Sequence, residues 1–95
     1  MTIRVVKRKA EIGAHLAAMV KSLMPEVDGR ALTWETPLAE GGVDMDSVKL
    51  LQLVVSAERT FGVEIEDDEL SRDVVATLGS LADFFWRKLQ VSPER

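Results

Sequence analysis

The residue pair in this chain that is best suited to chemistry is Asp46–Ser47. It stands between a glycine turn, Gly41–Gly42, and a long apolar-patterned run over residues 48–61. This arrangement predicts a serine hydroxyl at or just before the first residue of a helix, with a carboxylate beside it. An exposed hydroxyl on a rigid element is what another enzyme needs in order to attach a phosphate-linked group to a protein.

Other interpretations of these polar residues are weaker. From the local residues alone, Ser47 could simply cap a helix, because serine and aspartate are both favoured at that position. Asp44 and Asp46 resemble the start of a calcium loop, but Lys49 stands where the turn glycine is required. His15 is the only histidine and has no cysteine companion, which argues against a Ser-His dyad. We therefore predict no catalytic residue and no metal site.

Composition predicts a small globular protein. The chain has 95 residues, of which 46% are hydrophobic and 29% are charged, and it has no cysteine. We expect one domain over residues 1–95, without disulfides. No apolar run is long enough to span a bilayer and no secretory signal is recognisable, so we expect a cytoplasmic monomer without membrane contact.

Charge is distributed unevenly along the chain. Residues 1–30 carry six basic and three acidic side chains, a net of +3, and residues 31–95 carry six and thirteen, a net of −7. The acidic part would repel nucleic acid phosphates, which argues against a helix-turn-helix DNA binder. It favours protein partners with basic patches.

Apolar residues recur at helical spacing in three segments, separated by turn residues. Pro25 ends the first helix, Gly62 the second, and Thr77 is a plausible N-cap for the last. Trp34 and Leu38 should anchor the long loop to the core. The sequence thus predicts an all-α bundle of three main helices plus one short helix. We expect helices over residues 9–23, about 44–61, 66–70 and 77–89, with a loop over 25–43. The folded core should span about residues 9–89, between a basic arm over 1–8 and a frayed tail over 91–95.

The second predicted helix carries two apolar stripes. We expect the first stripe to face the core and the second to lie on an adjacent face. An apolar arc of this width indicates either deep burial or a strip kept for a partner. The first stripe consists of Leu50, Val54, Ala57 and Phe61, and the second of Val48, Leu51 and Val55.

The stretch from Gly42 to Ile65, GVDMDSVKLLQLVVSAERTFGVEI, resembles an acyl carrier protein. The resemblance covers roughly residues 9–89. It includes the long loop, the glycine turn, the Asp-Ser pair, the helix that ends in Phe-Gly, the acidic segment 64–70 and the last helix. An Asp-Ser pair alone is a weak signal, but in this order and spacing it is a strong one.

The chain departs from the family pattern at one point. The family usually has Gly-x-Asp-Ser, whereas here Asp44 and Met45 intervene before Asp46–Ser47. If Asp44 were the family aspartate, Met45 would occupy the serine position. We reject that register, because it would shift the helix pattern by two and move Lys49 onto an apolar position. The two extra residues then belong to the loop.

The resemblance implies a discrete carrier that is not an enzyme. A phosphopantetheinyl transferase would attach 4′-phosphopantetheine from coenzyme A to the serine, making a phosphoprotein whose distal thiol carries an acyl group as a thioester. Acyl-loading and acyl-transferring enzymes would be its further partners. The resemblance implies that Ser47, with Asp46 beside it, is the attachment residue. It implies partner docking for Val48, Leu51, Val55 and Glu58. It also implies an acyl cleft lined by Val54, Ala57 and Phe61, although ordinary core packing explains these three residues at least as well.

The pathway and the cargo stay open. Lys49, Gln52 and Arg59 occupy positions that are often acidic in fatty-acid carriers, which indicates a specialised carrier with different partners. Fatty-acid, polyketide and specialised lipid pathways are all compatible. Aminoacyl and peptidyl carriers more often have Gly, His or Asn before the serine, so Asp46 favours an acyl carrier. A D-alanyl-type carrier, or a helical interaction module that is never modified, stays possible.

Overall fold

Three α-helices make up the body of the protein, for which a computed structural model describes residues 8–90. They are α1 (Lys9–Leu23), α2 (Ser47–Phe61) and α3 (Leu78–Gln90), with single 3₁₀ turns η1 (Pro25–Val27) and η2 (Asp67–Glu69) between them. The predicted all-α bundle is confirmed. The expected short helix over 66–70 is only the 3₁₀ turn η2. The predicted tail and all of the predicted arm except Arg8 lie outside the described residues.

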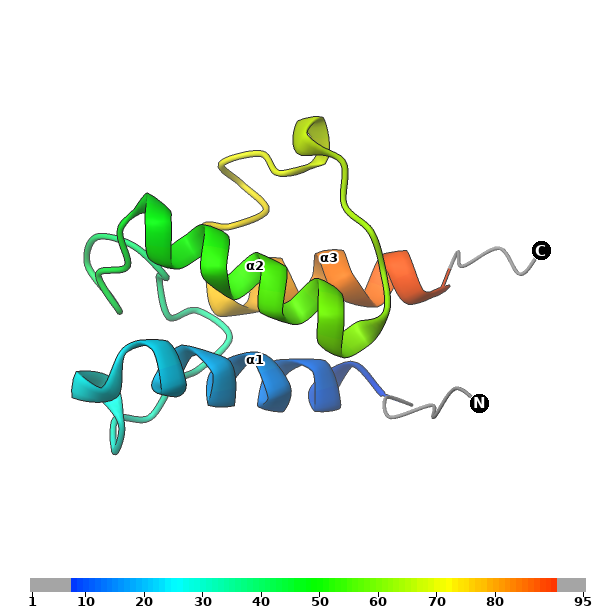
Figure 1. Ribbon diagram of the computed structural model, residues 1–95. Coiled ribbons are helices and arrows are strands. Elements are labelled where there is room, and N and C mark those ends of the chain that lie inside the picture. The colour runs from blue at the N-terminus through cyan, green and yellow to red at the C-terminus, as the bar shows by residue number, and fades with distance from the viewer. Residues whose placement is uncertain (1–7, 91–95) are drawn as a thin grey trace.

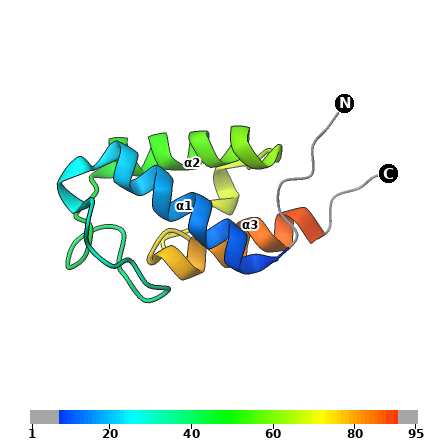
Figure 2. The ribbon, with the colours of Figure 1, turned by 90° about the horizontal axis from the view of Figure 1, so that it is seen from below.

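The helices are arranged so that α1 contacts both of the others. In Figure 1, α1 runs in the opposite direction to α2 and α3. The first residue of α1 and the last residue of α3 therefore lie at one end of the bundle, and the start of α2 lies at the other (Figures 1 and 2). None of the helices between residues 8 and 90 combines the length and the apolar character of a membrane span.

The core is built on helical spacing. Ile12, Leu16 and Val20 recur every four residues on α1, and all three are buried. Phe61 at the end of α2 packs against Phe85 of α3, with ring centroids 5.4 Å apart. Burial of each such side chain contributes about 1.5–3 kcal/mol. The remaining fully buried side chains are Leu38 from the loop, Leu53 and Ala57 from α2, and Leu81 and Ala82 from α3.

One assignment of the core face of α2 was wrong in detail. Leu50, which the spacing placed in the core, is only half-buried, whereas Leu53 is fully buried. Both residues lie within the wide apolar arc of α2, so the spacing alone did not determine where the centre of the buried face falls. The buried residues of the helix are Leu53, Val54, Ala57 and Phe61.

Two connecting segments complete the fold. The first (residues 28–46) carries three buried side chains, Leu38, Val43 and Met45. The second (residues 62–77) contains η2 and has no buried side chain. The two segments meet where the N–H of Leu38 donates to the carbonyl of Ala76, and an isolated antiparallel bridge joins Pro37 to Thr77.

Candidate functional site

The first turn of α2 is capped by Asp46, not by Ser47. Asp46 has an extended backbone, and its Oδ1 accepts a hydrogen bond of 2.9 Å from the backbone N–H of Lys49. Ser47 is therefore the first helical residue, and the capping explanation of this serine is wrong. The carboxylate of Asp46 sits at the positive end of the helix, where an acidic group is stabilising.

The residues before Asp46 are fixed by backbone hydrogen bonds. The N–H groups of Val43 and Met45 donate to the carbonyls of Pro37 and Leu38 at 2.9 Å each. The side chains of Val43 and Met45 both enter the core, and only 3% of Met45 is exposed. A side chain this deeply buried is out of reach of another enzyme, so the geometry supports the register in which Ser47 follows the two extra residues.

The turn itself depends on backbone positions that few residues adopt. Asp44 has a φ of 64°, in the left-handed region that aspartate tolerates better than most side chains. At Gly42, a Cβ atom would lie 2.1 Å from the carbonyl oxygen of Pro37. Only glycine permits that close approach. Of the Gly41–Gly42 pair that predicted a turn, the second residue must be glycine, because a side chain there would overlap Pro37.

The Ser47 side chain is exposed and chemically uncommitted. Its hydroxyl makes no hydrogen bond with any residue between 8 and 90. No histidine lies near it, because His15 packs edge-on against Phe61, 5.8 Å between ring centroids, at the opposite end of α2. That end is about 21 Å away at 1.5 Å per residue. No general base within the described residues therefore activates Ser47, and a reaction at this hydroxyl needs an external base.

The outward face of α2 is apolar. The exposed fractions of Val48, Leu51 and Val55 are 63%, 58% and 40%. Leu51 and Val55 also line a shallow groove with Leu23 from the end of α1, which Gln52, Ser56 and Arg59 complete. These residues were predicted for partner docking, and the fold gathers the three apolar side chains beside Ser47. Apolar side chains this exposed are typical of an interaction surface.

Glu58, the fourth predicted docking residue, has an internal hydrogen bond. Its Oε2 accepts a hydrogen bond of 2.8 Å from the backbone N–H of Ile65. This bond ties the start of the second connecting segment to α2. Gly62, which has a φ of 71°, ends the helix just before it. Sequence spacing gave no signal of the contact, because Ile65 lies beyond the end of the helix.

The inward face of α2 carries the predicted cleft residues. Val54, Ala57 and Phe61 are all buried. Ala57 and Phe61 belong to the main apolar cluster, together with half-buried Val63 and Ile65 of the second connecting segment. Burial leaves these three side chains little contact with solvent.

One ion pair joins the second connecting segment to α3. Lys88 contacts both carboxylate oxygens of Glu69 at 3.0 Å. The backbone N–H of Glu66 donates to Glu69 at 2.8 Å. That hydrogen bond lowers the pKa of Glu69 most, and the hydrogen bonds from Lys88 lower it further. A hydrogen bond of 2.8 Å from the Ser80 hydroxyl to the carbonyl of Val74 adds a further attachment.

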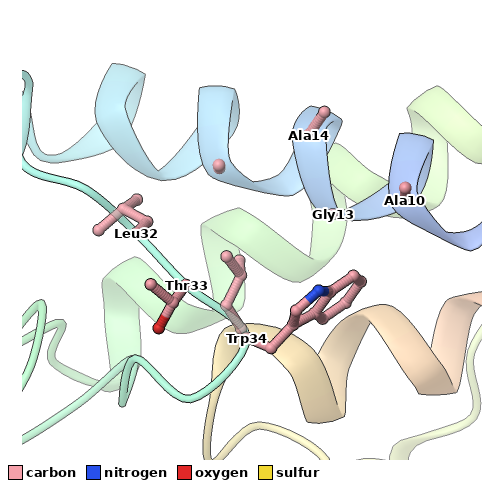
Figure 3. A pocket seen from close by; sticks show the side chains of 8 residues that line it. Ala10, Gly13, Ala14, Leu32, Thr33 and Trp34 are labelled. Atoms are coloured by element: carbon pink, nitrogen blue, oxygen red, sulfur yellow. The ribbon is translucent and has the colours of Figure 1, made fainter.

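A separate hollow lies away from α2 (Figure 3). Trp34 stands in it with 41% of its surface exposed, between α1 and α3. A Cβ at Gly13 would lie 3.0 Å from the indole ring, and one at Gly79 would lie 2.7 Å from the Trp34 carbonyl oxygen. Trp34 was predicted to anchor the loop to the core. It packs against buried Gly13 of α1 and Gly79 of α3 and stays partly exposed, whereas Leu38 is fully buried. No residue of α2 lines this hollow.

The chain was compared with known proteins. The family model described as "Phosphopantetheine attachment site" matches residues 14–85, which is most of the chain. The matched region includes all of α2 and the first connecting segment. Comparisons with curated proteins and with solved structures return no match.

Proposed function

This chain belongs to the phosphopantetheine attachment family, whose members carry covalently bound 4′-phosphopantetheine, and we propose that Ser47 is the residue that carries it. The observation that supports this choice is the exposed, unbonded hydroxyl of Ser47 at the first position of α2. Carrier domains of this family are generally not catalytic themselves, and they interact with phosphopantetheinyl transferases and biosynthetic enzymes.

The start of α2 fits a phosphate ester. The first backbone N–H groups of a helix have no partner within the helix, and they face the side on which a phosphate on Ser47 would lie. Asp46 keeps the N–H of Lys49 occupied, which holds the first turn in place. The Ser47 Oγ forms the new bond to phosphorus as the bond from phosphorus to the 3′,5′-adenosine bisphosphate part of coenzyme A breaks. The hydroxyl proton leaves to a base of the transferase.

When bound, the phosphopantetheine arm supplies a flexible thiol that carries cargo as a thioester. The chain's own part is to hold the attachment point on a rigid helix and to present it to partners. A tether of this kind turns encounters between the cargo and an enzyme into local ones. Val48, Leu51 and Val55 would provide the docking surface, and Glu58 would contribute through its remaining carboxylate oxygen.

The attachment site is tested by mass. The full chain and Ser47→Ala are incubated with coenzyme A and a broad-specificity phosphopantetheinyl transferase, with a known carrier as a positive control. We expect the wild-type chain to gain one phosphopantetheine and the variant to gain none. Ser22→Ala, which removes an exposed serine from α1, is the control and should be modified normally. A gain in Ser47→Ala, or none in the wild type, would contradict the proposal.

We further propose that the cargo is acyl, in a cytoplasmic fatty-acid, polyketide or specialised lipid pathway. Asp46 before the serine and the apolar inner face formed by Val54, Ala57 and Phe61 support this choice over an aminoacyl or peptidyl cargo. An apolar chain gains free energy from leaving water for that face, whereas a charged aminoacyl group would lose its hydration.

The cargo proposal is tested on the modified protein. The arm is loaded in parallel with a medium-chain acyl group and with an alanyl group, and methyl and amide NMR signals of the chain are compared. We expect the acyl group to shift the signals of Val54, Ala57 and Phe61, and the alanyl group to shift only signals near Ser47. Equal and local shifts for both cargoes would exclude the cleft role of these residues.

A further inference from the structure

The start of α2 has fewer side-chain restraints than the start of α1. On α1 the backbone N–H of Arg8 donates to the Glu11 carboxylate at 3.1 Å, which helps to close the first turn. On α2 the residue at the corresponding place is Lys49, whose side chain has no acceptor atom. Its own N–H bonds to Asp46, but no carboxylate returns a bond to the cap. Because helix ends fray readily, another restraint is needed to keep Ser47 in place.

Met45 is placed to supply that restraint from the position just before the cap. Its side chain is 3% exposed and belongs to the main apolar cluster. Leu50, the fourth residue of α2, is half-buried and packs against the same cluster. Apolar residues at these two positions often pack together and fix the angle at which the chain enters a helix. Ser47 lies between them in the sequence.

The backbone of Met45 is tied to a distant part of the fold. Its N–H donates to the carbonyl of Leu38 at 2.9 Å, and the N–H of Leu38 donates to the carbonyl of Ala76 at 3.0 Å. The side chain of Leu38 is itself fully buried. The residue two positions before Ser47 is therefore held both by its side chain and by its backbone.

We propose that Met45 is a positioning residue for the modification of Ser47, because it holds the first turn of α2 and so presents the hydroxyl to the transferase at one place. This inference rests on the proposed attachment at Ser47. Met45 is too deeply buried to touch the transferase, so it acts through the backbone that joins it to the serine. A displacement of about 1 Å can slow a reaction by up to about a hundredfold, so a modest loosening of this turn is measurable.

The test measures kcat and KM separately for modification of the full chain by a transferase that modifies the wild type. In Met45→Ala we expect kcat to fall about tenfold and KM to change less than about twofold, because the exposed face of α2 is untouched. Met45→Leu keeps an apolar side chain of similar size and should restore kcat to within about twofold of the wild type. Leu16→Ala truncates a fully buried side chain on α1 and should also keep kcat within about twofold, provided that circular dichroism shows a folded protein.

Amide hydrogen exchange reports on the turn directly. In Met45→Ala the N–H groups of Lys49 and Leu50, which both bond to Asp46, should exchange at least about tenfold faster than in the wild type. In Leu16→Ala they should exchange as in the wild type. If Met45→Ala does not fold, Leu50→Ala takes its place, because it truncates a half-buried side chain and should give the same changes in kcat and in exchange.

The opposite results would overturn the proposal. If kcat of Met45→Ala equals that of the wild type, the position of the hydroxyl does not depend on Met45. If KM rises and kcat does not fall, Met45 acts on docking. If Leu16→Ala loses as much kcat, the loss comes from general destabilisation. If the wild type gains no phosphopantetheine, the attachment at Ser47 itself fails, whereas unchanged exchange at Lys49 and Leu50 in Met45→Ala removes the positioning role alone.

Discussion

The two connecting segments of this protein are attached to the bundle in different ways. The first, residues 28–46, is held by backbone hydrogen bonds and by the buried side chains of Leu38, Val43 and Met45. The second, residues 62–77, has no fully buried side chain. It is held by polar contacts of Glu58, Glu69 and Ser80 and by half-buried apolar side chains that pack against the core, namely Val63, Ile65, Val74 and Val75. The segment that precedes Ser47 is thus part of the core, whereas the segment that follows α2 lies on its surface.

This difference matters for a carrier. Under the proposal that Ser47 is modified, the attachment point should be rigid, because a transferase must find the hydroxyl in a fixed position. Half-buried Val63 and Ile65 of the second connecting segment pack against the apolar cluster that contains Ala57 and Phe61 of α2. Breaking a few half-buried polar contacts should cost less free energy than removing a leucine side chain from the core. With attachment at Ser47 as proposed above, we expect the site to stay fixed while the second connecting segment opens more readily than the first.

The largest expected effect comes from truncating Leu38, the buried side chain that anchors the first connecting segment. Leu38→Ala should lower the free energy of unfolding by about 3–4 kcal/mol, because it leaves a cavity at a fully buried site. The matched change in the second segment, at half-buried Leu70, should lower it by only about 1 kcal/mol. Urea denaturation of both variants measures the two values. Equal losses would mean that the two segments are held equally firmly.

A smaller effect is expected from the glycines at the two ends of α2. In Gly42→Ala the new Cβ would overlap the carbonyl of Pro37, so we expect a loss of about 2–3 kcal/mol. Gly62→Ala meets no neighbouring atom within 4 Å and should lose only about 1 kcal/mol, from its positive φ. Denaturation midpoints with unchanged m-values provide the measurement. A larger loss at Gly62 would reverse the comparison.

The smallest effect should be the pH dependence of the ion pair between Glu69 and Lys88. The folded protein lowers the pKa of Glu69, so the stabilisation is fully present above the unfolded pKa and is lost as pH falls through the folded value. The difference in unfolding free energy between wild type and Glu69→Gln should therefore shrink on acidification. Lys88→Met should speed amide exchange in the second segment and leave exchange in α1 unchanged. A difference that does not vary with pH would show that Glu69 acts through packing.

Much of this fold was predictable from local patterns. The range Lys9–Leu23 for α1 was predicted from the spacing of its apolar residues and from Pro25. The end of α2 at Phe61 followed from Gly62, and the Thr77 cap of α3 is confirmed by a hydrogen bond of 3.0 Å from the N–H of Ser80 to its Oγ1. Each of these features depends on residues that are close in sequence.

The features that sequence could not predict depend on distant residues. The exposure of Trp34 is set by Gly13 and Gly79, which lie on two different helices. Leu53 is fully buried although Leu50 was predicted to be, and this difference depends on how α1 packs against α2. The role of Ser47 at the start of its helix was ambiguous for a related reason, since aspartate and serine are both good caps and only the hydrogen bond from Lys49 to Asp46 decides between them.

The position of Ser47 relative to the ends of α1 and α3 has a practical consequence. Lys9 and Gln90 lie at one end of the bundle and Ser47 lies at the other (Figure 1). The length of α2, about 21 Å, separates the two ends. A fluorescent protein, a purification tag or a neighbouring enzyme fused before α1 or after α3 would therefore sit on the far side from Ser47. If Ser47 is the attachment site, as proposed, such a fusion should still be modified, and the chain would then serve as a module for immobilising cargo on a surface.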